Sequence, residues 1–211
     1  MRIQWKGHSS FLLSSDNGKK VLTDPFNEQV GLPLPNVDVD VVTVSHQHGD
    51  HNATNLLPGT PVVVEKDGGH VVAGIEIRGI TAYHDMEQGA QRGSNTIFII
   101  TIDEINICHL GDLGHPLTPK QVADIGKVDI LLVPVGGFYT IDSKQAYEIV
   151  QQLQPSFIVP MHYKLDERMH YPIASVDEFL SYYSDIKKQE VLTVTKTSLP
   201  KEAQVVLFTL A

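Results

Sequence analysis

The chain has 211 residues, of which 42% are hydrophobic and 19% charged, a composition typical of ordinary globular proteins. This composition excludes an intrinsically disordered chain and provides enough apolar side chains for a large core. The formal charge of −9, with only 16 basic residues, argues against a general nucleic-acid-binding protein, because neutralising phosphates requires clustered Lys and Arg.

Short apolar runs that are typical of strands dominate the first half of the sequence. They lie at residues 3–5, 11–13, 21–23, 41–45, 62–64, 75–77 and 96–102, and later runs follow at 106–109, 128–133, 157–159, 190–194 and 204–208. Helix signals occur at Thr118 with Pro119, over residues 142–153 and at the capping-box pattern of residues 175–178, and a short helix is expected over 52–57. No linker divides the chain, so we expect one domain over residues 1–211, of the α/β (α+β) class, with two packed sheets flanked by helices.

Two features of the sequence bear on where the protein works. Cys108 is the only cysteine, so no disulfide can form within the chain. The apolar run Phe11–Leu13 is too short for a signal sequence or a membrane span. We therefore expect a cytoplasmic protein that does not bind a membrane.

The segment His46–His51 places four potential metal ligands within six residues, directly after an apolar run. A tight turn at Gly49 would let His46 and His48 converge on one ion while Asp50 and His51 point toward a second ion. Solvated loop histidines are the ordinary alternative, but three histidines packed together at a strand end would repel one another when protonated. Imidazole and carboxylate ligands suit Zn²⁺, and the absence of a thiolate keeps Mn²⁺, Fe²⁺, Co²⁺ and Ni²⁺ compatible.

Three later positions provide further ligands at the ends of apolar runs: His84, Asp112 and His162. The ordered set HxHxDH, His, Asp and His resembles the metallo-β-lactamase superfamily over nearly the whole chain. The resemblance implies a four-layer αββα sandwich with a pair of metal ions at the edge of its two sheets.

The resemblance also implies a role for each ligand position. It assigns His46, His48 and His84 to the first ion, Asp50, His51 and His162 to the second, and Asp112 to both ions as a bridge. Asp24 is similar to an early aspartate of the family, which orients the ligand loop instead of binding metal.

Three residues are candidates for catalysis beyond metal binding. Two ions that share a water lower its pKa from about 15.7 toward roughly 7, which would provide a bridging hydroxide as nucleophile, and Asp50 would orient it. His8 lies in a predicted hairpin loop that the resemblance places beside the metals, where it would contact substrate or a metal. His115 follows Asp112 by three residues and is a candidate proton donor to the leaving group. The alternatives are a solvent-facing loop histidine for His8 and a helix-entry role for His115.

The sequence also offers candidates for binding the substrate. Gly137 belongs to a glycine turn before the helix predicted at 142–153, and backbone N–H groups there would receive an anionic group. Tyr139 and Tyr163 lie in loops near predicted ligands and are candidates to line the pocket. A plain tight turn and ordinary surface tyrosines are the alternatives.

Residues 7–10, 111–115 and 134–140 are similar to a compact branch of the superfamily that contains ascorbate-6-phosphate-lactonase-like proteins. The branch implies a hydrolase that cleaves a small ester, lactone or phosphodiester, with an anionic small molecule as substrate. The chain lacks the long insertions of the lactonase and the accessory domains of the related nucleases. Asp112 argues against antibiotic hydrolysis, because true β-lactamases of this fold lack a bridging aspartate. The alternatives are a non-catalytic metal-binding sensor or scaffold and, with less support, a nuclease.

Overall fold

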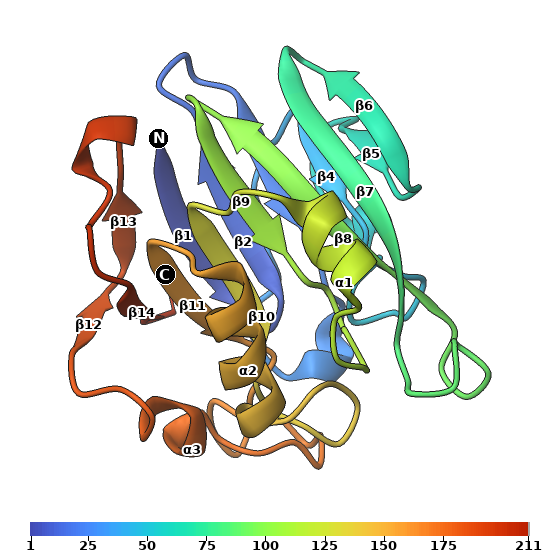
Figure 1. Cartoon of the computed structure of the whole chain (residues 1–211). Coiled ribbons are helices and arrows are strands. Elements are labelled where there is room, and N and C mark those ends of the chain that lie inside the picture. The colour runs from blue at the N-terminus through green and yellow to red at the C-terminus, as the bar shows by residue number, and fades with distance from the viewer. Residues whose placement is uncertain (211) are drawn as a thin grey trace.

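The computed structural model describes residues 1–210 and contains two β-sheets that pack face to face (Figure 1). The last residue of the predicted domain 1–211, Ala211, lies outside the described residues. The six-stranded sheet has the order β13 (Val191–Thr193), β1 (Arg2–Gly7), β2 (Ser10–Ser14), β3 (Lys20–Thr23), β4 (Val41–Thr43) and β5 (Val62–Val64). The eight-stranded sheet has the order β12 (Ile186–Gln189), β14 (Gln204–Phe208), β11 (Phe157–Met161), β10 (Ile130–Pro134), β9 (Ile105–His109), β8 (Ser94–Ile102), β7 (Ile75–Tyr83) and β6 (Gly68–Val72).

Both sheets mix parallel and antiparallel pairs. In the six-stranded sheet the first four strands pair antiparallel, whereas β3, β4 and β5 run parallel. In the eight-stranded sheet β6 to β9 pair antiparallel, and β9, β10, β11, β14 and β12 run parallel. As a result, β7, β9 and β11 all point in one direction.

The main core fills the space between the sheets, because side chains alternate between the two faces of a strand. Phe11 and Leu13 of β2 belong to this core, and the ring of Phe11 meets that of Phe208 from the other sheet at 6.2 Å. Leu12 points the opposite way, into a separate cluster with Leu22 and other residues on the outer face of the six-stranded sheet. Apolar side chains on both faces explain why β2 has no polar alternation in its sequence.

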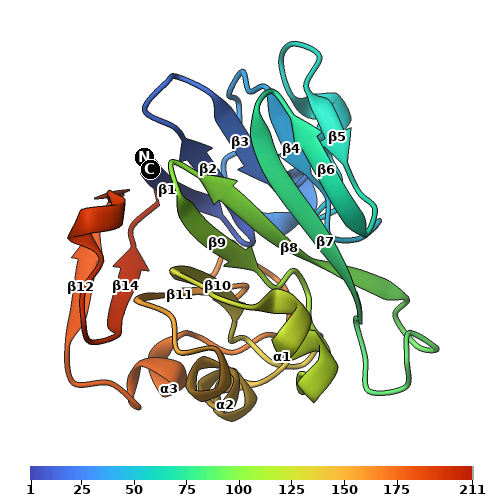
Figure 2. The ribbon, with the colours of Figure 1, turned by 45° about the horizontal axis from the view of Figure 1, so that its top comes forward.

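The three α-helices lie over the outer face of the eight-stranded sheet (Figure 2). They are α1 (Pro119–Ile125), α2 (Ser143–Leu153) and α3 (Asp177–Leu180). The outer face of the other sheet packs instead against loop residues such as Val39 and Leu57, beside the short 3₁₀ helix η2 (Thr54–Leu56) that replaces the helix expected at 52–57. The predicted fold class is confirmed, with the difference that loops form most of one of the two outer layers.

The structure differs from the sequence prediction at three further elements. Strands β6 and β12 were not predicted, because β6 begins with two glycines and β12 is mostly polar. The capping box predicted at residues 175–178 is wrong: the Ser175 hydroxyl donates to Asp177, and Val176 takes the N-cap position without a side-chain bond. None of the helices within residues 1–210 has the length and apolar character needed to cross a bilayer.

Candidate metal centre

The candidate ligands lie where several strands end at one edge of the sandwich. Asp24 follows β3 and the segment His46–His51 follows β4, and these two strands are parallel neighbours. His84, Asp112 and His162 follow β7, β9 and β11, which share a direction in the other sheet. Strands that point the same way end at the same edge, so the fold brings together residues that are far apart in the sequence.

The carboxylate of Asp112 lies at the centre of the cluster and contacts histidines from both sheets. Its Oδ2 atom lies 3.0 Å from Nε2 of His162, 3.2 Å from Nε2 of His84, 3.3 Å from Nε2 of His51 and 3.9 Å from Nε2 of His46. The side chain is almost fully buried. Burial alone would raise the pKa of Asp112, but His162 and His51 hold it well below its usual range.

Asn95 and two bonds between the sheets fix the backbone around this cluster. Asn95 accepts a hydrogen bond from the N–H of Asp112 at 2.9 Å and donates to the carbonyl of Leu110 at 2.9 Å. The N–H of Thr96 donates to the carbonyl of Ser45 at 2.8 Å, and that of His162 donates to the carbonyl of His8 at 3.3 Å. Sequence reasoning missed Asn95, because an asparagine at the start of a strand carries no recognisable signal.

Asp24 sets the orientation of two histidines without facing the cluster itself. One of its oxygens accepts a bond from the Ser45 N–H at 2.8 Å, and the other accepts from the Ser45 hydroxyl at 2.5 Å and from Nδ1 of His51 at 2.9 Å. Because the Ser45 hydroxyl donates to Asp24, its oxygen is left to accept from Nδ1 of His46, 3.0 Å away. Both imidazoles therefore use Nδ1 for these bonds and direct Nε2 at the cluster, the orientation in which an imidazole binds a metal.

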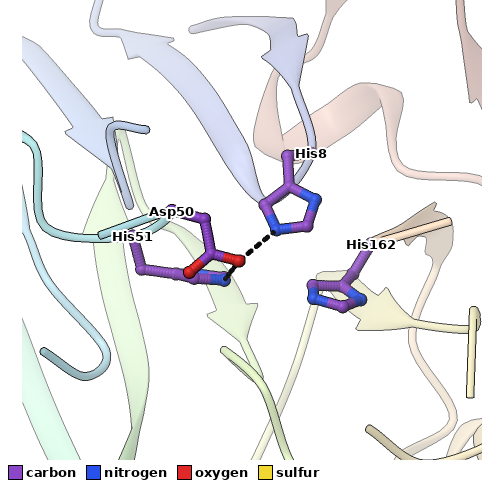
Figure 3. Close-up of side chains that lie close together, drawn as sticks. All are labelled: His8, Asp50, His51 and His162. Atoms are coloured by element: carbon purple, nitrogen blue, oxygen red, sulfur yellow. Dashed lines mark ion pairs between the residues drawn. The ribbon is translucent and has the colours of Figure 1, made fainter. Parts of the chain in front are cut away.

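The donor atoms form two principal groups, in each of which they lie within 4.8 Å of one another. The first consists of His46, His48 and His84. The second, drawn in Figure 3, consists of His8, Asp50, His51 and His162. A third set repeats His46 and His51 together with Asp24, whose oxygens are already bonded.

Several buried polar atoms of these groups have no hydrogen-bond partner within residues 1–210. They include both ring nitrogens of His8, Nε2 of His46 and His51, Nδ1 of His84 and His162, and Oδ1 of Asp112. Unpaired polar atoms are costly in a protein interior, and this concentration of lone pairs is what a divalent ion would satisfy. The donor set of imidazoles and carboxylates fits one or two such ions.

The charges of the histidines differ sharply within this small volume. Burial and the neighbouring His51 lower the pKa of His46 to about 3, so its imidazole is neutral at pH 7. Burial would also lower the pKa of His51, but the carboxylates of Asp112, Asp24 and Asp50 outweigh it and raise this pKa well above the usual value. His51 is thus the imidazole of this pair that holds a proton at neutral pH when no cation is bound.

A cavity of about 280 Å³ opens onto the cluster. It is lined by His48, Asp50, His84, Arg92, Asp112, Tyr139, His162 and Tyr171. The predicted residue Tyr139 is among them, whereas Arg92 and Tyr171 were not predicted. The guanidinium of Arg92 lies over the ring of Tyr139, 5.6 Å from its centroid.

Asp85 holds the loop that carries Arg92. Its carboxylate accepts bonds from four backbone N–H groups, those of Glu87, Gly89, Gln91 and Arg92. Burial would raise the pKa of Asp85, but these four bonds lower it to about 2. The carboxylate is therefore ionised at neutral pH, and it fixes the loop by charge-assisted bonds.

Three predicted residues belong neither to the cavity lining nor to the ligand groups: His115, Tyr163 and Gly137. His115 lines a different groove. The chain turns away after Gly114, whose N–H donates to the Tyr83 carbonyl. One ring nitrogen of His115 then contacts the Tyr83 N–H, and the other contacts the Pro116 carbonyl. Tyr163 is buried and stacks on Trp5 at 5.4 Å, because it points opposite to its neighbour, His162.

Gly137 lies in a turn before α2, but it does not line the cavity either. The first turn of α2 is closed by a capping box in which the side chains of Asp142 and Gln145 bond to each other's backbone N–H groups. These two N–H groups are thus already satisfied within the helix, and the anion-binding role predicted for this turn gains no support from the geometry.

Comparison with known proteins gives matches over most of the chain. Residues 2–162 match the model of the family described as Beta-lactamase superfamily domain. A protein of Carboxydothermus hydrogenoformans named UPF0173 metal-dependent hydrolase is 30% identical over 77% of this chain and 84% of its own length. A relative of the same designation from Pyrococcus abyssi is 30% identical over 91% of this chain and 96% of its own length.

A crystal structure from Thermotoga maritima extends the match to the fold. It is described as a Zn-dependent hydrolase of the metallo-β-lactamase superfamily and is 40% identical to this chain. It aligns with a TM-score of 0.83 over 98% of this chain and 97% of its own. The predicted family and fold class are therefore confirmed.

The role of Asp24 generates a first prediction. We expect Asp24→Asn to weaken metal binding by roughly 10- to 100-fold, the usual effect of losing a group that orients a ligand. The amide would direct a donor at the Ser45 hydroxyl or at Nδ1 of His51, which disturbs the lone pairs of both histidines. Titration of the chelated protein with Zn²⁺ in a calorimeter measures this effect.

The control is Asp185→Asn, the same chemical change at an exposed residue that pairs only with Lys187. It should bind Zn²⁺ as the unmodified protein does. Equal affinity in both variants would show that Asp24 does not act on the ligands.

Proposed function

The chain belongs to the metallo-β-lactamase superfamily and to its metal-dependent hydrolases, and we propose that it cleaves a small anionic ester, lactone or phosphodiester using two divalent ions. The observation that carries this proposal is the cluster of unpaired buried donors around Asp112, next to an open cavity. Each of the two groups offers at least three ligand atoms, and a catalytic zinc site uses three protein ligands.

In this proposal His46, His48 and His84 hold one ion, and Asp50, His51 and His162 hold the other. Asp112, which contacts histidines of both groups, serves both ions. Two ions held in this way would provide a hydroxide at neutral pH, by lowering the pKa of a shared water to roughly 7, and would polarise the carbonyl or phosphoryl oxygen of the substrate. Zn²⁺ is our first choice of metal, and the ligand set also accommodates Mn²⁺, Fe²⁺, Co²⁺ and Ni²⁺.

The residues of the chain provide the orientation that this chemistry needs. Asp50 is partly exposed at the cavity, where its carboxylate is placed to orient the attacking hydroxide. Tyr139 and Tyr171 line the same cavity and meet edge to face at 6.3 Å, which provides an apolar wall. A cavity of about 280 Å³ suits a small molecule rather than a polymer.

The charge around the cavity favours an anion as substrate. Two divalent ions carry four positive charges, which Asp24, Asp50, Asp112 and the proposed hydroxide would together balance. Arg92 adds a further positive charge at the cavity wall, and within residues 1–210 its guanidinium pairs with no carboxylate. A carboxylate or phosphate on the substrate would complete this arrangement, because guanidinium groups bind such anions in bidentate fashion.

Metal removal tests the proposal as a whole. We expect the purified protein to contain two divalent ions per chain and to hydrolyse at least one member of a panel of anionic esters, lactones and phosphodiesters. Chelation should abolish the activity and added Zn²⁺ or Mn²⁺ should restore it, because the nucleophile depends on the ions. Activity that survives complete removal of metal would contradict the proposal.

Two variants and one binding measurement complete this test. Asp112→Asn should abolish hydrolysis, whereas His115→Gln should preserve it, because His115 lies outside the cavity. A protein that binds two ions and cleaves nothing in the panel would favour the sensor or scaffold alternative. Salt-sensitive binding of RNA or DNA would favour a nuclease.

Arg92 generates a prediction about substrate recognition. We expect Arg92→Ala to raise KM for an anionic substrate roughly 10- to 100-fold, equivalent to about 1.5–3 kcal/mol for hydrogen bonds to a charged group. The KM for a neutral substrate of the same reaction should change little. Arg2→Ala, which removes an exposed arginine on β1, is the control. An equal change in KM for both substrates would mean that Arg92 does not recognise charge.

A further inference from the structure

His8 is held by its backbone in a rarely occupied conformation at the edge of the metal centre. Its φ angle of +52° lies in the left-handed region, which a residue with a Cβ adopts only where its surroundings impose it. Two bonds to its carbonyl fix the residue, one from Nε1 of Trp5 at 2.9 Å and one from the N–H of His162 at 3.3 Å. The loop between β1 and β2 is therefore built to aim this side chain in one direction.

The imidazole of His8 points at the second group of ligands (Figure 3). Its Nε2 atom lies 3.4 Å from Oδ2 of Asp50, and its ring lies 4.2 Å from the ring of His162 and 5.0 Å from that of His51. The side chain is fully buried, and neither of its nitrogens has a hydrogen-bond partner within residues 1–210. A buried imidazole whose two nitrogens are both unpaired needs a ligand to offset its desolvation.

The geometry of the four side chains fits one ion among them. One donor atom from each of His8, Asp50, His51 and His162 lies within 4.8 Å of the others. Two donors that are each 2.0–2.1 Å from one zinc ion lie at most about 4.2 Å apart, so small side-chain movements would close the set.

We propose that His8 is a further protein ligand of the second metal ion, in addition to Asp50, His51, His162 and the shared Asp112. The inference rests on the proposed dinuclear centre and makes its two sites unequal. With Asp112 included, the second ion would have five protein ligands, whereas the first would have four, His46, His48, His84 and Asp112, of which His48 is exposed. The second site therefore binds its ion more tightly, and the open positions for water and substrate lie at the first ion.

A role in which His8 only orients Asp50 fits the contacts less well. The distance of 3.4 Å between His8 and Asp50 is long for a hydrogen bond to a carboxylate. An orienting role would also leave unexplained why His8 faces the rings of His51 and His162.

Metal titration of variants tests this inference. We expect the chelated unmodified protein to bind two Zn²⁺ ions in two steps of unequal affinity. His8→Gly suits the backbone because glycine adopts a positive φ without strain, and His8→Gln keeps a side chain that can donate to Asp50. In both variants the tighter step should weaken by at least about 100-fold, because a direct ligand is worth more than the 10- to 100-fold of an orienting group.

His70→Gln is the matched control, because it makes the same change at a histidine of β6 that contacts the Lys66 carbonyl and belongs to neither ligand group. It should keep both binding steps within about threefold, and the absorption spectrum of its Co²⁺ form should match that of the unmodified protein. The His8 variants should change that spectrum, because the coordination of one ion changes.

The outcomes separate the two proposals. If the unmodified protein binds no second ion, the dinuclear centre itself is wrong. If the unmodified protein binds two ions and His8→Gln binds both with the same affinity and spectrum, the dinuclear centre stands and His8 is not a ligand. A His8→Gly variant that fails to fold leaves the decision to His8→Gln.

Discussion

The structure depends on one constraint: several ionisable side chains are buried at the edge where the two sheets meet, and their charges must balance there. Asp112, from the eight-stranded sheet, contacts His51 from the six-stranded sheet as well as His84 and His162 from its own. These contacts alone leave many polar atoms unpaired. Cations bound among them would satisfy those atoms and would join the two sheets through their side chains.

The backbone around this edge is organised before any ion binds. Ser45 and His8 each accept a bond from the opposite sheet, so the two halves of the centre are held in register. Asp24 then fixes the imidazoles of one residue in each ligand group, His46 through Ser45 and His51 directly. A single buried carboxylate thus orients one imidazole in each candidate site, which would reduce the reorganisation that metal binding requires.

Much of the fold, and the set of side chains that gather in the candidate metal centre, could be predicted from the sequence, because both leave local signals. The apolar runs marked most strands. The HxHxDH run of His46–His51 is dense in potential metal ligands, and a protein without a metal site has little need of such a pattern. His84, Asp112 and His162 gave weaker signals, and the order of the set together with their positions at strand ends made them recognisable. Strands β6 and β12 escaped because edge strands with glycine or polar residues lack an apolar pattern.

The rest of the site depends on tertiary structure that no local pattern records. His115 is three residues from Asp112 in sequence but faces another groove, and Tyr163 adjoins His162 but points into the core. Arg92 and Tyr171, in contrast, reach the cavity from loops whose sequences have no motif. A candidate chosen by its distance in sequence from a ligand is unreliable, because one turn or one step along a strand reverses the direction of a side chain.

The most direct measurement is a crystal structure of the metal-loaded protein with anomalous scattering recorded at the absorption edge of the bound metal. The account predicts two peaks on either side of the Asp112 carboxylate, one in contact with His46, His48 and His84 and the other with Asp50, His51 and His162. A map with no peak at this edge of the sheets, or with its ions bound elsewhere on the chain, would contradict it.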